Sequence, residues 1–264
     1  MKKIIFASLL LAVLPFLSCN TIQKTWSNMN AFDVSEDIKL GKQVSDEIAA
    51  NPSKYPLLAE SGNEEVYGYI RNITKNILST GRVAHRNDFA WQVKIINDDK
   101  TLNAFCTPGG YIYVYTGIIK YLDSEDQLAG VMGHEIAHAA NRHSTQQMTK
   151  IYGMDILLQA ALGKKNQMGQ IAESLVGLSF SRDHERDADD NSVLYLCGTT
   201  YNSAGAAGFF KKIQSKGGTP PQFLSTHPNP ANRVQAIEAK AKQMNCKGSN
   251  TNTAQYARIK SLLR

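Results

Sequence analysis

The sequence has little of several features that mark specialised classes of protein. Its 264 residues show no internal repeat, and the one long hydrophobic run, Ile4 to Phe16, is too short to span a bilayer comfortably. The net charge of +6 is not gathered into a basic stripe, and it falls by two if Lys2 and Lys3 are removed. A repeat architecture, a membrane-spanning domain and a nucleic-acid-binding role therefore receive no support.

Cysteine is also scarce, with four residues in the chain. Apart from Cys19 there are three, and in an oxidising compartment an odd number leaves at least one thiol unpaired unless a partner chain supplies another. Cys197 and Cys246 lie near expected helix ends in the C-terminal third and could form a disulfide, although two separate buried thiols fit the sequence as well. Cys106 is expected to be a packed thiol.

The chain does contain enough apolar material for one well-buried catalytic domain. Hydrophobic residues make up 42% of the sequence and charged residues 20%, both ordinary values for a globular protein. Composition alone therefore excludes neither an enzyme nor a binding module.

The N-terminus has the organisation of an export signal, because two lysines precede the apolar run and small and polar residues end it. The run closes on Leu17-Ser18-Cys19, which resembles a bacterial lipobox and implies lipidation of Cys19. We therefore expect a lipoprotein signal peptide over residues 1–18, a polar tether over 19–33 and a single domain over 34–264. Ordinary signal cleavage, leaving Cys19 as a free or paired thiol, is the alternative.

Apolar spacing predicts an α+β domain that is mostly helical and has a small β-sheet. One-faced helices are expected over residues 35–50 and 64–79, and strands over 89–96 and 111–115, the second after a turn at 108–110. A further helix begins at Ser124, which forms an expected capping box with Gln127. The remaining helices are expected over about residues 154–178, 185–197, 204–213 and 233–244.

The helix that begins at Ser124 carries the strongest chemical signal, His134-Glu135-Ile136-Ala137-His138. Two imidazoles four residues apart lie on one face of a helix and can bind the same ion, with Glu135 beside them. Neutral imidazoles suit Zn²⁺, which in catalytic sites takes three protein ligands and leaves one position for water. The alternative is a surface helix whose histidines have no metal-binding role. We expect the metal site, with one Zn²⁺ per chain.

The third ligand is not fixed by this motif. The candidates are His143, His184, Glu185, Asp187 and Asp189. Helical geometry disfavours His143, since it would lie about 140° around a continuous helix from His138. Glu185 and Asp189 share one face of a predicted helix, so one carboxylate can ligate while the other orients a histidine. A solvated, acidic helix start is the alternative reading of this segment.

The motifs together identify a resemblance to the family of HtpX and the CAAX prenyl endopeptidases, over roughly residues 40–240. Among its branches the chain is most similar to exported lipoproteins of the LoiP kind. The resemblance implies a zincin-like metalloprotease domain, with Glu185 as third ligand and Asp189 as its partner residue. The matching segments are Asn103-Ala104-Phe105 with Pro108-Gly109-Gly110, His134 to His138, Ser181-Arg182 with Glu185, Ala188 and Asp189, and Ser225-Thr226-His227-Pro228.

Roles for further residues follow from this resemblance and from chemistry. Glu135 is the expected general base. His227 is a candidate to stabilise the oxyanion, or a loop residue before Pro228, and Arg233 could pair with the acidic helix or be solvated.

The segment Asn103, Ala104 and Phe105 is expected to be an edge strand that binds substrate backbone by strand addition. An asparagine at this position is also a common turn residue.

These expectations combine into a zinc-dependent metalloendopeptidase of the bacterial cell envelope. It would be anchored through lipid on Cys19 to the outer membrane, facing the periplasm, and would hydrolyse exported, misfolded or unassembled polypeptides through Glu-assisted attack of zinc-bound water. A chaperone or assembly factor that uses the same groove without cutting is the main alternative, and a zinc-buffering protein is a third. The sequence predicts no oligomeric state.

Overall fold

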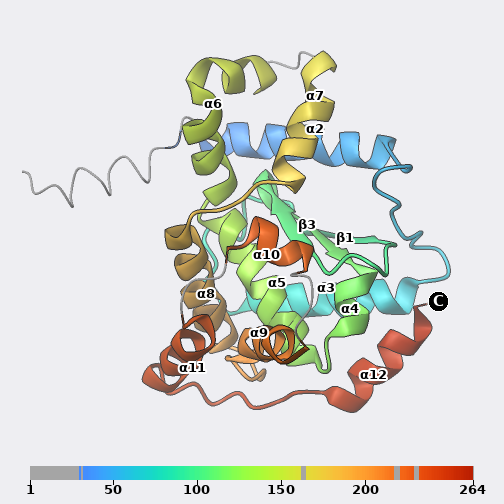
Figure 1. Ribbon diagram of the computed structural model, residues 1–264, viewed down its shortest axis with the longest axis vertical. Helices are drawn as coiled ribbons and strands as arrows, with labels where there is room; N and C mark the ends of the chain where they lie inside the picture. Colours follow the sequence, from blue (N-terminus) through green and yellow to red (C-terminus); the bar gives the residue numbers. More distant parts are fainter. Residues whose placement is uncertain (1–29, 31, 162–164, 217–220, 229–231, 264) are drawn as a thin grey trace, which may run out of the picture.

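The computed structural model describes residues 30, 32–161, 165–216, 221–228 and 232–263 (Figure 1). Cys19 and nearly all of the expected tether lie outside these residues. Within the described ranges no helix is both long and apolar enough to cross a membrane. The elements are α2 Val34–Ala50, α3 Glu64–Ser79, β1 Gln92–Ile96, β2 Ala104–Thr107, η1 Pro108–Gly110, β3 Tyr111–Tyr115, α4 Thr116–Tyr121, α5 Glu125–Ala140, α6 His143–Ala161, α7 Lys165–Val176, α8 Arg182–Leu196, α9 Gly205–Lys216, α10 Gln222–Thr226, α11 Arg233–Gln243 and α12 Thr253–Leu262.

The predicted fold class, α+β and mostly helical with a small sheet, is confirmed. The strand order is β1-β3-β2, with β1 parallel and β2 antiparallel to β3. The reversal between β2 and β3 requires left-handed backbone at Gly109 and Gly110, with φ of 73° and 83°, which glycine adopts without a steric penalty. β2 is therefore an outer strand of this sheet, as predicted for residues 103–105.

The sheet separates two apolar layers (Figure 1). On one face α3 and α5 pack against Val93, Ile112 and Val114, and on the other face α2 and α7 cover Phe105 and Tyr113. Burial on both faces explains why every residue of β3 is inaccessible. α2 and α3 follow the predicted apolar spacing, and their buried residues include Leu40, Val44, Ile48, Val66, Ile70, Ile73 and Ile77.

Helix α5 lies in the middle of the molecule and is buried almost all round. Two glycines allow its neighbours to approach: a Cβ on Gly130 would lie 2.2 Å from the Ala206 nitrogen of α9, and one on Gly133 would lie 2.9 Å from Ser192 of α8. The capping box predicted at Ser124 is wrong, because its side chain makes no cap bond. Ser124 instead donates to Asp126, since the acidic start of α5 is buried in polar tertiary contacts.

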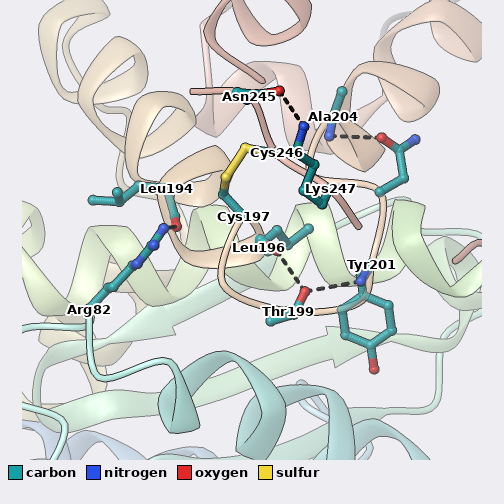
Figure 2. Close-up of a disulfide and its surroundings, with 11 residues drawn as sticks. Arg82, Leu194, Leu196, Cys197, Thr199, Tyr201, Ala204, Asn245, Cys246 and Lys247 are labelled. Carbon is teal, nitrogen blue, oxygen red and sulfur yellow. Dashed lines mark hydrogen bonds between the residues drawn. A yellow bond between two sulfur atoms is a disulfide. The ribbon is translucent and has the colours of Figure 1, made fainter. Parts of the chain in front are cut away.

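Cys197 and Cys246 form a disulfide, which decides between the pairing and the two separate thiols that the sequence left open (Figure 2). Cys197 caps the C-terminal end of α8, and Cys246 follows α11. Arg233, the first residue of α11, contacts Asp189 in the middle of α8 and Glu185 near its start. The two helices therefore run in the same direction. Cys106 is the free cysteine of the described part of the chain and is buried, as expected.

Candidate metal centre

Four buried side chains converge where α5, α8 and the segment after α10 meet. One potential ligand atom from each of His134, His138, Glu185 and His227 lies within 4.8 Å of all the others. His134 Nε2 and His138 Nε2 are 3.0 Å apart. The Glu185 carboxylate lies 3.3 Å from His138 Nε2 and 3.5 Å from His134 Nε2. The helical spacing of the two histidines and the distant carboxylate thus meet at one point, as the sequence predicted.

The chemistry of these donors fits a single zinc ion. Two neutral imidazole nitrogens facing each other at 3.0 Å repel through their lone pairs unless a proton or a cation lies between them. The adjacent Glu185 carboxylate is fully buried, and a buried charge requires compensation. Two imidazoles and a carboxylate are the ligand types of catalytic zinc sites. The residues present therefore fit a bound Zn²⁺.

The outward nitrogen of His134 is held by a buried ion pair. His134 Nδ1 lies 2.9 Å from Asp189 Oδ1, and Arg233 contacts both oxygens of that carboxylate at 2.7 Å. Arg233 is 2% exposed and also lies 3.2 Å from Glu185, so it is not solvated. Burial by itself lowers the pKa of His134, but hydrogen bonds with Asp189 and Glu185 outweigh it and raise that pKa to about 9.

Glu135 points toward the same centre. It is 1% exposed, and its Oε1 has no hydrogen-bond partner among the described residues. Burial raises the pKa of Glu135 above its ordinary value, and the nearby His227 and His134 oppose that rise. A raised carboxyl pKa is suited to a group that takes and returns a proton near neutral pH.

His227 lies between Glu135 and the ligand cluster. Its Nδ1 is 3.0 Å from Glu185 and 3.3 Å from His134, while its Nε2 is 3.5 Å from Glu135. The sequence predicted a role in oxyanion stabilisation, but these distances also make His227 a possible fourth ligand. Its ring stacks on Phe223 at 4.2 Å, which fixes it to α10.

The predicted substrate-binding residues lie beside the centre but are covered. Asn103 is 2% exposed, Ala104 0% and Phe105 6%. The Phe223 amide of α10 donates to the Leu102 carbonyl, two residues before β2. Helix α10, which His227 follows, is therefore bonded to the segment that leads into the strand predicted to bind substrate.

His143, which helical geometry placed away from His138, contacts that ligand. His143 Nδ1 lies 3.0 Å from His138 Nδ1, because α5 ends at Ala140 and Arg142 has a left-handed φ of 59°. The sequence signal was Asn141, a residue common where a helix ends. The angle predicted between His138 and His143 assumed a helix that continues past Asn141, and α5 does not continue.

The comparisons with known proteins agree with this geometry. The model described as "Peptidase family M48" matches residues 65–241, a span that contains His134, His138, Glu185 and His227. The chain belongs to peptidase family M48. This membership confirms the family predicted from the motifs and the class of zinc metallopeptidase.

Several relatives of this M48 chain carry names of proteases. It is 29% identical over 177 residues to "Mitochondrial metalloendopeptidase OMA1" of Schizosaccharomyces pombe, covering 64% of this chain and 51% of the relative. It is 28% identical over 188 residues to "Beta-barrel assembly-enhancing protease" of Escherichia coli, covering 64% and 38%. It is 27% identical over 190 residues to "Metalloprotease YcaL" of Escherichia coli, covering 67% and 73%. The match thus spans about half or less of the first two relatives.

Proposed function

We propose that this M48 chain is a zinc-dependent metalloendopeptidase. The observation that carries the proposal is the approach of His134, His138 and Glu185 to one point, with the Glu135 carboxylate, whose Oε1 makes no hydrogen bond with the described residues, beside it. Zinc held there would supply a Lewis acid that polarises a scissile carbonyl and acidifies water.

In this proposal the chain's own residues handle the proton and the developing charge. Glu135 takes a proton from the attacking water and delivers it to the leaving amine, as its raised pKa favours. His227 donates to the oxygen on which negative charge develops. Asp189 and Arg233 keep His134 in a fixed orientation. Substrate backbone would add to β2 as a further strand once the contact with α10 opens.

We also propose that the enzyme acts in the bacterial cell envelope, anchored by lipid on Cys19 over a tether of residues 19–33 and carrying the peptidase domain over 34–264. The Cys197–Cys246 disulfide supports an oxidising compartment. The name of one Escherichia coli relative, "Beta-barrel assembly-enhancing protease", supports a role near proteins that are being assembled. Misfolded or unassembled exported polypeptides are the proposed substrates.

Zinc dependence tests the proposal. The purified protein should hold about one zinc per chain and cleave an unfolded protein, lose cleavage when a chelator removes the metal, and regain it with zinc. A chelated protein that cleaves as fast as the untreated one contradicts the proposal. If the untreated protein suppresses aggregation of unfolded chains without cutting them, the non-proteolytic chaperone is favoured instead.

The position of His227 favours one second candidate, a closed structural or buffering zinc site with four protein ligands. A closed four-ligand site gives no role to the buried Glu135, whose Oε1 makes no hydrogen bond with the described residues. His227→Ala separates the two functions: a catalytic site with three other ligands keeps stoichiometric zinc, whereas a closed four-ligand site loses much of its affinity.

A further inference from the structure

We infer that His143 and Asp187 are positioning residues for the zinc ligand His138. The inference rests on the proposed function only in taking His138 as a ligand. The three side chains form a continuous series, with His138 Nδ1 3.0 Å from His143 Nδ1 and His143 Nε2 3.3 Å from Asp187 Oδ2. This series is separate from the series formed by His134, Asp189 and Arg233, which supports the other histidine ligand, His134.

The tautomers of this series are mutually consistent. His138 directs Nε2 toward His134 and Glu185, so in the ligating form Nε2 has a free lone pair and Nδ1 carries the proton. That proton points at His143 Nδ1, which must then be the acceptor. The proton of neutral His143 is consequently on Nε2, where it faces the Asp187 carboxylate. In the opposite pair of neutral tautomers, His143 Nε2 would face the Asp187 carboxylate with a lone pair instead of a proton, so the geometry favours the zinc-binding tautomer of His138.

A buried corner holds His143 in this place. Arg142 has φ of 59°, a region that costs energy for a residue with a side chain. Its guanidinium bonds Asp37 Oδ2 and the Phe32 carbonyl, both at 2.5 Å, and Asp37 is 1% exposed. Contacts with the start of α2 thus support the turn that brings His143 back against α5.

Other residues around His143 fix the plane of its ring and the orientation of the neighbouring Asp187 carboxylate. The ring of His184 stacks on it at 4.4 Å with a 12° angle, and neither nitrogen of His184 has a hydrogen-bond partner among the described residues. His184 therefore contributes packing. Asn141 Nδ2 donates to Asp187 Oδ2 at 2.5 Å, and this orients the carboxylate toward His143 although Asp187 is half exposed. The expected consequence is a fixed His138 ring with higher basicity toward zinc.

Two substitutions of His143 separate hydrogen bonding from packing. His143→Phe keeps an aromatic ring between His138 and His184 but removes the acceptor. His143→Asn removes the ring but can place an amide oxygen near the position of Nδ1. Asp187→Asn removes the charge at the end of the series. His85→Asn is the matched control, because His85 also pairs with an acid (3.1 Å from Nδ1 to Asp88), is not one of the four clustered ligand residues and has a positive φ that asparagine tolerates.

Zinc affinity of the purified proteins, measured by competition with a chromophoric chelator, is the readout, and thermal denaturation of the metal-free forms checks folding. We expect His143→Phe to weaken zinc binding roughly 10–100-fold, with a smaller loss for Asp187→Asn. His143→Asn should bind more tightly than His143→Phe, and His85→Asn should match wild type.

Wild-type affinity in His143→Phe, or equal weakening in His143→Asn and His143→Phe, overturns the inference, because packing alone would then explain the contact. The proposed function fails by a different result, a wild type that binds zinc without cleaving. The affinity comparison among the variants decides the positioning role in that case also.

Discussion

Removing the Cys197–Cys246 disulfide should destabilise the fold by a calculable amount. The bridge closes a chain segment with a sequence separation of 49 residues, for which the chain-entropy relation gives about 4 kcal/mol at 25 °C. For a domain of this size such a loss lowers Tm by roughly 8–16 °C. The bridge joins the C-terminal end of α8 to the segment after α11, and the contact of Arg233 with Asp189, in the middle of α8, does not depend on it. The double variant Cys197→Ser with Cys246→Ser should therefore fold and keep zinc at 25 °C.

The assay is urea and thermal denaturation of the metal-free protein, for wild type and the double variant, each with and without a reductant. Reductant should lower the Tm of wild type toward that of the variant and leave the variant unchanged. Equal free energies of unfolding for wild type and variant would refute the reasoning, as would a reductant effect of the same size in both proteins.

Further predictions concern the interior and the centre. Gly130→Ala forces a Cβ against Ala206 and should lower the free energy of unfolding by about 1–3 kcal/mol in urea titrations; an unchanged midpoint contradicts the packing. Burial raises the pKa of Cys106 well above its ordinary value, so mass spectrometry should find it alkylated only after unfolding. Asp189→Asn should weaken zinc binding roughly 10–100-fold in chelator competition. Because the pKa of His134 is about 9 without metal, zinc must displace a proton from it. The affinity for zinc should therefore fall as the pH is lowered from 9 to 6, and an affinity that does not change with pH argues against this.

Local patterns were sufficient to predict much of the fold and the centre. Apolar spacing identified α2 and α3, and the aromatic and β-branched run after the glycine-rich turn identified β3. The pair His134 and His138 could be recognised because residues four apart share one face of a helix. Glu185 required the family resemblance, since spacing alone left five candidates.

The features that were missed depend on tertiary contacts. The start of α5 was predicted to be capped by Ser124 and Gln127, but its acidic residues make tertiary contacts, and Tyr201 and Asn252 bond Glu125 from later parts of the chain. The helix expected over 154–178 is divided into α6 and α7. The corner at Arg142 needs Asp37 of α2, a residue about a hundred positions away, so helical geometry alone gave His143 the wrong direction.

The central claim is that Glu135 acts as the base beside a zinc ion held by His134, His138 and Glu185. Its most direct test measures zinc content and hydrolysis of an unfolded protein on the same preparation of Glu135→Gln. The variant should keep about one zinc per chain and lose nearly all cleavage, because the amide cannot accept the proton. Cleavage at the wild-type rate by the zinc-loaded variant would contradict the account.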